Sequence, residues 1–241
     1  MPLYRDEAVV LRTYKLGEAD RIVVLFGRSK GKIRAVAKGV RKTKSKFGSK
    51  LEPGSIIKAQ FYEGKNLDIV TQAERSRSLP LLRTDLERYG RVSILLESVD
   101  QTTDDNDPNP AMFKLLTGAL TELERTGNAL VVPAFVARLL ALEGVQPMVD
   151  SCVSCGAESN LVSIELREGG VLCGSCRRGP SISDGARQAL SHILHGRVRY
   201  VLDNTPPLVQ NELEALAARM VEQHTERRLR SSAVIYQQMQ G

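Results

Sequence analysis

The chain has 241 residues, 42% of them hydrophobic and 26% charged, and it contains no tryptophan. This composition predicts a globular protein of one or two domains and excludes a disordered or collagen-like chain. The formal net charge of +6 and the pI of about 9.2 favour an acidic partner. Residues 5–7 of the N-terminus are charged, where a signal peptide would have its apolar core. The apolar stretch 130–142 is short and is broken by Pro133 and Arg138. We therefore expect neither a signal peptide nor a membrane span, and a cytoplasmic location.

The first eighty residues predict a small β-barrel. Alternating hydrophobicity and β-branched residues indicate five strands, at residues 7–13, 20–26, 32–37, 55–62 and 67–73, with turn sequences between them. Five strands in this order favour an OB-fold barrel, whose sheet face and loops bind oligonucleotides. The connection 38–50 would then follow the third strand. A barrel with another purpose stays open, because a fold does not fix a function.

The positive charge is concentrated in this part of the chain. Residues 28–50 include ten Lys or Arg and no Asp or Glu, and the first fifty residues carry a net charge of +10. Such a local field attracts phosphodiesters through counterion release. The alternative is a solvated lysine-rich loop or a localisation tract. The expected phosphate contacts are Arg34, Lys38, Arg41, Lys42, Lys44, Lys46 and Lys50, and Phe47 is the expected base-stacking residue.

After Pro80 the hydrophobic periodicity becomes helical. It predicts helices at residues 84–100, 109–126 and 131–143, the first with a capping box formed by Thr84 and Glu87. The pattern returns at residues 183–195 and from 208 to about 239. We thus expect an α+β, multi-domain chain: an OB-fold domain at 1–80, a helical domain at 81–148 and 181–241, and a cysteine module at 149–180.

All four cysteines of the chain lie in that module. They form two Cys-x2-Cys pairs separated by seventeen residues, Cys152 with Cys155 and Cys173 with Cys176. This spacing lets four thiolates converge on one tetrahedral Zn²⁺, and a short hairpin between the pairs would complete a zinc ribbon. We expect one structural Zn²⁺ per chain, which supplies the folding free energy because no apolar core is visible here.

Other uses of the cysteines remain open. Two redox-active pairs, a disulfide framework or a catalytic zinc would each use these residue types, but four thiolates close a tetrahedral shell. His192, His195 and His224 are expected to be ordinary surface or core residues rather than ligands. No nucleophile–base arrangement, phosphate-binding glycine loop or paired-carboxylate motif has a recognisable spacing, so we expect no enzymatic activity.

Three segments together resemble the RecO family of bacterial recombination mediators. They are residues 16–26, LGEADRIVVLF; residues 31–54, which contain GKIRAVAKGVR, SKFG and LEPG; and residues 135–144, FVARLLALEG, which lead to Cys152. The likeness covers essentially the whole chain, in the family's order of barrel, helices, cysteine ribbon and returning helices. The N-terminal segments are its most specific part, since cysteine pairs alone fit many families.

The resemblance implies a non-enzymatic, nucleoid-associated DNA repair protein. Such a protein binds single- and double-stranded DNA, anneals complementary strands and, with RecR, helps to load the RecA recombinase onto strands coated by single-strand binding protein. Some members lack the four cysteines, which implies a structural zinc. Arg138 is the candidate contact for the acidic tail of single-strand binding protein, with a salt bridge inside the helices as the alternative. A zinc-dependent nucleic-acid-processing enzyme and a zinc-ribbon transcription or translation factor are the alternative functions.

Overall fold

The computed structural model describes residues 2–231, and the chain forms two compact units. The N-terminal unit comprises residues 1–125 and the C-terminal unit residues 126–241. The expected boundary near Pro80 lies inside the N-terminal unit, which holds the barrel and the helices that directly follow it. Over residues 2–231, no helix combines the length and the apolar character that crossing a membrane would require.

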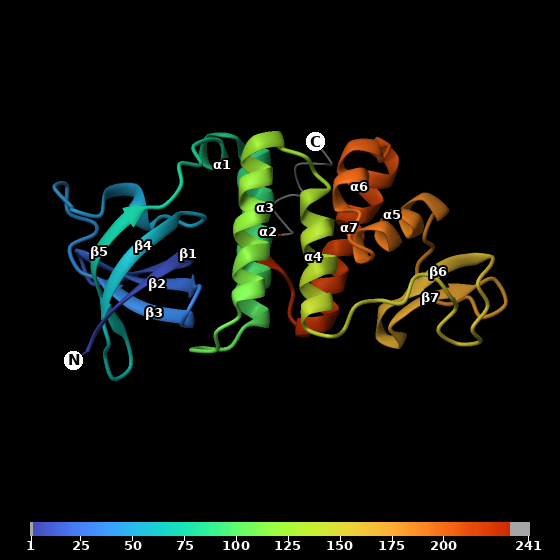
Figure 1. The fold of residues 1–241 in the computed structure, drawn as a ribbon, viewed down its shortest axis with the longest axis horizontal. Helices are drawn as coiled ribbons and strands as arrows, with labels where there is room; N and C mark the ends of the chain where they lie inside the picture. The colour runs from blue at the N-terminus through green and yellow to red at the C-terminus, as the bar shows by residue number, and fades with distance from the viewer. Residues whose placement is uncertain (1, 232–241) are drawn as a thin grey trace. The chain divides into compact units, whose positions relative to one another are not determined.

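Five strands close into a barrel in the order β1-β2-β3-β5-β4 (Figure 1). They are β1 (Leu3–Leu16), β2 (Asp20–Gly27), β3 (Gly31–Ala37), β4 (Ile56–Tyr62) and β5 (Asp68–Arg75). The β3–β5 pair is parallel and the other four pairs are antiparallel. A bulge between Val10 and Arg12 bends β1, whose first half pairs with β4 and whose second half pairs with β2. The predicted five-stranded, OB-like barrel is confirmed.

The segment between β3 and β4 supplies part of the barrel core. It contains a short 3-10 helix, η1 (Gly48–Leu51). Phe47 precedes this helix and Leu51 is its last residue. Both residues are 1% exposed and belong to the hydrophobic cluster inside the barrel. The prediction that Phe47 stacks on a base is therefore wrong, because η1 turns its ring inward and the burial of apolar surface holds it there.

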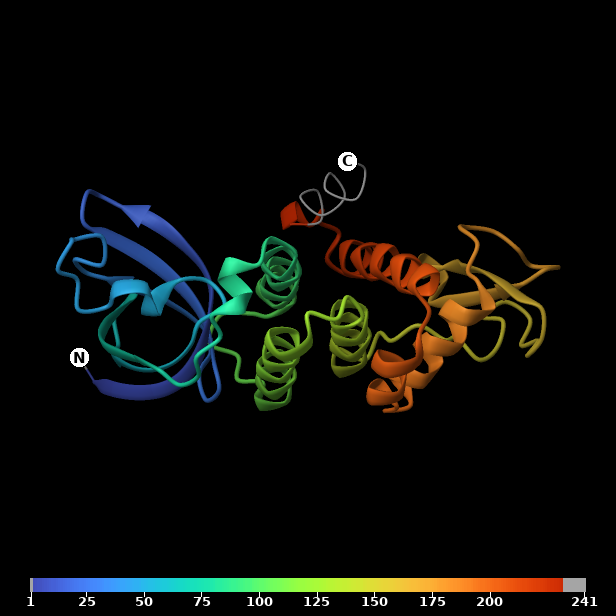
Figure 2. The ribbon, with the colours of Figure 1, turned by 90° about the horizontal axis from the view of Figure 1, so that it is seen from above.

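Three helices follow the barrel: α1 (Leu81–Thr84), α2 (Leu86–Thr102) and α3 (Pro110–Thr126). The long helices α2 and α3 lie side by side with nearly parallel axes (Figures 1 and 2). The predicted capping box at Thr84 is wrong, because Thr84 ends α1. The cap of α2 is Asp85, whose carboxylate accepts the Arg88 N–H at 3.1 Å.

A charged cluster joins the barrel to these helices. Lys32 of β3 is only 7% exposed, and its ammonium donates to the carbonyls of Asp100, at 2.8 Å, and Thr103 at the end of α2. Arg12 of β1 forms a 2.9 Å salt bridge with the Asp100 carboxylate. Gly31 has φ +68°, and an added Cβ would lie 2.0 Å from the Asp107 carbonyl oxygen, so only glycine fits there. The barrel and the α2–α3 connection are thus fixed together.

Between residues 126 and 225, the C-terminal unit contains the helices α4 (Val131–Leu142), α5 (Asp184–Leu194), α6 (Val198–Asn204) and α7 (Pro207–Thr225). Helix α4 packs against α5 and α7. The sequence did not predict α6. The prediction of one helix from 208 to about 239 is also wrong, since α7 ends at Thr225, where Glu226 adopts a left-handed conformation with φ +52°. Residues 232–239 of that prediction lie outside the described residues.

The cysteine module forms a two-stranded hairpin beside these helices (Figure 1). Strands β6 (Leu161–Glu165) and β7 (Gly170–Cys173) are joined by a 3-10 turn, η2 (Leu166–Glu168), and by Gly169. The expectation that this module lacks an apolar core is wrong. Ile164, Val171 and Leu172 are at most 2% exposed, and η2 contacts α7. Packing against the helical domain therefore contributes to the stability of the hairpin.

Candidate nucleic-acid interface and metal centre

The basic loop, residues 38–46, is anchored at its base to the β1–β2 turn. The Gly39 N–H donates to the Asp20 carboxylate at 2.7 Å, and the Arg41 N–H donates to the Ala19 carbonyl at 2.9 Å. The Arg41 guanidinium adds a 3.2 Å bond to the Gly17 carbonyl. These bonds fix where the loop leaves the barrel, and they leave the positive charge of Arg41 without a carboxylate partner among the described residues.

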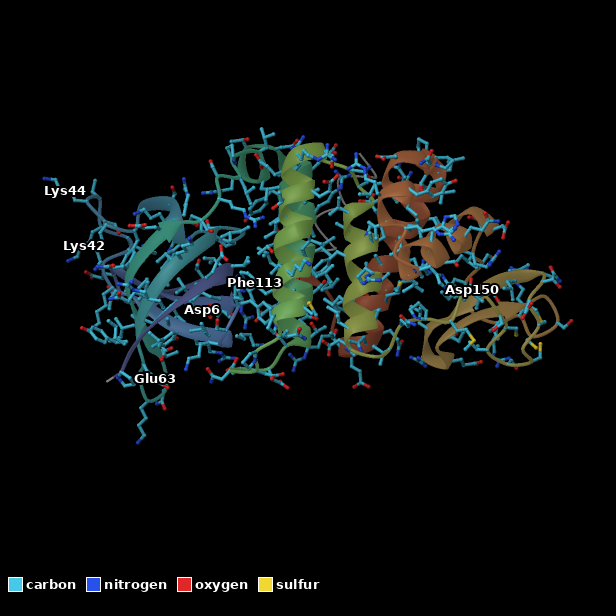
Figure 3. The ribbon with its side chains drawn as sticks, viewed as in Figure 1. Asp6, Lys42, Lys44, Glu63, Phe113 and Asp150 are labelled. Atoms are coloured by element: carbon cyan, nitrogen blue, oxygen red, sulfur yellow. The ribbon has the colours of Figure 1, made fainter. Side chains whose placement is uncertain are left out.

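The tip of the basic loop presents unpaired positive charge. Lys38, Lys42 and Lys44 are exposed, and none of them forms a salt bridge within residues 2–231. Lys42 and Lys44 point away from the barrel (Figure 3). Flexible ammonium groups in this position can follow a phosphate backbone without large rearrangement of the protein.

The exposed Lys46 and the half-buried Lys50 both help to hold the loop. The Lys46 ammonium donates to the Thr71 carbonyl at 2.7 Å and lies 5.1 Å from the centre of the Phe47 ring. The Lys50 ammonium lies 3.4 Å from the Lys46 carbonyl, to which it donates. Both lysines bond neutral oxygens, so their net charge remains available to an anion.

Arg34 differs from the loop residues because an acid faces it. Its guanidinium pairs with Asp105 at 3.1 Å, and its side chain is 49% exposed. The neighbouring Lys32 carries a buried charge committed to the end of α2. The basic run of the sequence thus has two parts. Lys32 and Arg34 contact α2 and the α2–α3 connection, whereas the residues beyond 37 form the basic loop.

Two further arginines lie beside η1, outside the predicted set. Arg75, at the end of β5, and Arg83, in α1, both donate to the carbonyl of Ser49. Neither belongs to the continuous basic run, so charge counting along the sequence does not find them. The only signal for them in the sequence is the arginine-rich stretch between the barrel and the helices.

The four cysteines form a single cluster. Their Sγ atoms all lie within 4.8 Å of one another, and Sγ of Cys155 is 3.7 Å from Sγ of Cys173. A tetrahedral zinc with Zn–S bonds of about 2.3 Å places its sulfurs about 3.8 Å apart. The donor set and its spacing therefore fit a four-thiolate metal site. Among the described residues, this is the only group of cysteine, histidine and carboxylate side chains with such spacing.

Local backbone geometry brings each cysteine pair into position. In the first pair, the Gly156 N–H donates to the Cys152 carbonyl at 2.8 Å, and Gly156 has φ +78°, which favours glycine. In the second pair, the Cys176 N–H donates to the Cys173 carbonyl at 3.1 Å. Each pair is therefore a tight turn, and backbone N–H groups are directed toward the sulfurs of Cys152 and Cys155.

The environments of the thiols are unequal. Backbone N–H donors, that of Cys173 foremost, lower the pKa of Cys152 to about 6. A backbone donor at Ala157 also lowers the pKa of Cys155, but the three neighbouring sulfurs together outweigh it and raise that pKa to about 11. A cation at the centre would remove this conflict, because it stabilises all four thiolates at once.

The histidines and Arg138 have other surroundings. His192 packs edge-on against Tyr200, with ring centres 5.2 Å apart, and Nδ1 of His195 lies 2.9 Å from the Ser191 carbonyl. His224 lines a surface hollow between α7 and η2. The half-buried Arg138 donates to the Leu194 carbonyl at 3.4 Å, which links α4 to α5.

Comparison with known proteins places both halves of the chain. Residues 1–79 match the family model described as "Recombination protein O N terminal", and residues 83–233 match "Recombination protein O C terminal". The chain is 40% identical to the DNA repair protein RecO of Frankia casuarinae over 96% of its own length and 97% of that protein. It is 40% identical to the RecO of a Nocardioides species, over 97% and 99%, and 36% identical to that of Thermobifida fusca, over 98% and 99%.

Proposed function

The chain belongs to the RecO family of DNA repair proteins, and from this membership and the basic loop we propose that it is a DNA-binding recombination mediator. It binds single- and double-stranded DNA and anneals complementary strands. Its protein partners are RecR and the acidic C-terminal tail of single-strand binding protein, and through them it helps to load RecA. It works beside the nucleoid.

The observation that carries the proposal is the unpaired charge of the basic loop. Lys38, Lys42 and Lys44 extend from a closed barrel, and no carboxylate neutralises them in the described residues. Such a surface lowers the repulsion between two phosphate backbones and holds both strands at a high local concentration. Base pairing between the strands then completes annealing, without a chemical step by the protein.

The cysteine cluster supports a structural rather than a catalytic zinc. Four thiolates occupy every position of a tetrahedral shell, so the metal would have no open position for an activated water. When bound, the zinc supplies folding free energy to the module and holds the two turns together. On this proposal, Cys152, Cys155, Cys173 and Cys176 are its ligands, and the protein is not an enzyme.

The experiment that tests the proposal removes the three free lysines. The variant Lys38→Gln/Lys42→Gln/Lys44→Gln should bind single-stranded DNA more weakly, because each lost phosphate contact lowers the log–log salt slope by about 0.7. The expected change in slope is about 2, measured by fluorescence anisotropy over a series of salt concentrations.

A matched variant controls for total charge. Lys58→Gln/Lys65→Gln/Lys114→Gln removes the same number of exposed lysines outside the loop, and it should keep most of the affinity. Equal losses in the two variants would mean that net charge, rather than the basic loop, attracts DNA, and an unchanged slope in the folded loop variant would refute the proposed interface.

A further inference from the structure

Two arginines converge on one backbone oxygen where η1, β5 and α1 meet. Nη2 of Arg75 donates to the Ser49 carbonyl at 3.1 Å and to the Ser49 hydroxyl at 2.6 Å. Nη1 of Arg83 donates to the same carbonyl at 3.3 Å. The two positive side chains therefore lie against each other, although they come from separate elements.

No salt bridge neutralises this pair. Neither Arg75 nor Arg83 forms a salt bridge with any residue that the structure describes. Of the nearby carboxylates, that of Glu52 is bonded to Arg21 at 2.9 Å, and that of Glu124 accepts the N–H groups of Leu81 and Leu82. Partial burial, followed by the charge of Arg75, lowers the pKa of Arg83 by more than the charges of Glu52 and Glu124 raise it. The arrangement thus costs free energy in the protein alone, and an anion would relieve that cost.

The arginine pair retains free donors for such an anion. A guanidinium has five N–H donors, and the bonds to Ser49 use one nitrogen of each arginine. Arginine forks match the geometry of phosphate oxygens, and two forks side by side can hold one phosphodiester from both sides. A single carbonyl satisfies only a small part of this capacity.

The position of the pair relates it to the basic loop. A surface hollow of about 390 Å³ lies beside η1, and its lining includes Lys46, Lys50 and Arg75 together with Ser49 and one acid, Glu74. The hollow therefore runs from the end of the loop to Arg75, the first arginine of the pair, and its lining holds three cations and one carboxylate. A strand that binds the loop can continue along this side of the barrel.

We propose that Arg75, Arg83 and the Ser49 hydroxyl form a second phosphate-binding position, which takes a backbone phosphodiester of the strand held by the basic loop. The inference rests on the proposed function, since it assigns a further contact of the same DNA path. It extends that path from the β3–β4 segment to α1.

The test compares two variants of equal charge. Arg75→Gln/Arg83→Gln should lower the salt slope for single-stranded DNA by about 1.4, since two contacts of about 0.7 each are lost. The dissociation constant of the variant, divided by that of the unaltered protein, should therefore rise by about 25-fold for each tenfold dilution of salt below about 1 M. The control, Arg91→Gln/Arg125→Gln, removes two arginines that pair with glutamates of their own helices, and should change the slope little. Arg75→Lys/Arg83→Lys keeps the charge but loses the forks, and should fall between the two.

A second measurement uses the unaltered protein, in case Arg75 and Arg83 are also needed to fold η1. Phenylglyoxal modifies accessible arginines, and mass spectrometry of peptides gives the rate at each position. Bound single-stranded DNA should slow the modification of Arg75 and Arg83 several-fold and leave Arg91 and Arg125 nearly unchanged.

The outcomes separate this inference from the proposed function. Weak binding by the loop variant, with full affinity in the arginine variant and no protection by DNA, would overturn the second phosphate position alone. Absence of DNA binding by the unaltered protein would overturn both. Loss in the arginine variant together with protection of both arginines supports the inference, whether or not the variant unfolds more easily.

Discussion

At the scale of single residues, the outcome for the basic run depends on what covers each side chain. Alternation in β3 predicts that Ile33 and Ala35 point inward and that Lys32 and Arg34 point outward, as the structure shows. It cannot predict that the α2–α3 connection covers the outward face at Lys32. Long-range packing therefore buries Lys32, whose ammonium caps the end of α2.

Phe47 illustrates the opposite error. Its neighbours Lys46 and Gly48 suggested an exposed ring in a charged loop, but η1 places Phe47 and Leu51 together in the barrel core. An aromatic residue four positions before an apolar one is also the pattern of a short helical turn with one buried face. That pattern was the available signal, and it is too short to outweigh the charges around it.

Asp100 provides a test in which desolvation competes with ion pairing. Burial raises the pKa of this carboxyl from its ordinary value of 3.8, and the nearby Arg12 and Lys32 lower it by less. The folded state then binds the Asp100 proton more tightly than the unfolded state does. Hence the stability contributed by Asp100 is greatest below pH 3.8 and is lost as the pH rises through the raised pKa.

We predict that Asp100→Asn gains stability relative to the unaltered protein as the pH rises from about 4.5 to about 7.5. The amide keeps an oxygen that can accept from Arg12 but has no charge to desolvate. Urea unfolding of both proteins at the two pH values gives the difference, in which other titrating groups cancel. If the variant instead loses stability relative to the unaltered protein as the pH rises, the charges of Arg12 and Lys32 outweigh the effect of burial on Asp100.

At the scale of elements, long periodic segments were predictable and short ones were not. All five strands and the helices α2, α3, α4 and α5 were predicted close to their positions. The elements α1, α6, η1 and η2 have seven residues or fewer, too few for a periodic pattern to be recognised. The end of α7 was missed because Glu226 takes a conformation that usually marks glycine or asparagine.

The sequence predicted the four cysteines that come together in the ribbon, but it did not predict how the ribbon packs. Spacing alone identifies the four sulfurs that the structure brings together, because a short hairpin leaves few other arrangements. The buried Ile164, Val171 and Leu172 were taken as strand residues without a core. For Ile164 the reason is sequence distance, since it lines a hollow with Leu216 of α7, more than forty positions away. The ribbon is therefore held by helical packing, and its four sulfurs lie close enough together to share one metal ion.

We predict that Cys152→Ser loses most of the one zinc per chain expected for the reduced protein, since a hydroxyl replaces a thiolate ligand. Stability should fall by about 3 kcal/mol, a typical scale for loss of a metal site, or roughly 10 °C in unfolding temperature. Plasma emission spectrometry and calorimetry measure the two quantities. Ser154→Ala changes an exposed side chain between two ligands and is the matched control.

The ribbon lies in the C-terminal unit, so the N-terminal unit of the Cys152→Ser protein should remain folded. Its DNA affinity should therefore stay close to that of the unaltered protein. Purified reduced protein that contains no zinc, or that has its cysteines in disulfides, would contradict the metal assignment.

At the scale of the whole molecule, charge distribution and chemistry lead to the same function. The net charge is +10 in the first fifty residues and +6 in the chain, so the remainder is acidic overall. On the proposed function, we therefore expect DNA to bind at the barrel of the N-terminal unit, whereas the C-terminal unit carries the cysteine cluster. The sequence could indicate this division through its charge, but it could not reveal Arg75 and Arg83, which folding brings together from separate elements.

The last prediction separates a mediator from a nucleic-acid-processing enzyme. The full chain should accelerate pairing of complementary single strands and leave each strand chemically intact. A catalyst would need an activated water or nucleophile with an acid or base in reach, but a shell of four thiolates has no open position for such a water. Annealing needs only a surface that screens phosphate repulsion, so its rate should fall steeply with salt and should not respond to ATP.

Labelled strands followed on native and denaturing gels, with and without Mg²⁺, measure pairing and integrity in one time course. The loop variant that lacks Lys38, Lys42 and Lys44 should anneal slowly, and Cys152→Ser should anneal at nearly the normal rate because it keeps the barrel. Strand cleavage or base conversion that disappears in Cys152→Ser would instead identify the cysteine cluster as a catalytic centre. Pairing that is equally fast in the loop variant would mean that another surface brings the strands together, and the arginine pair at Ser49 is then the next surface to remove.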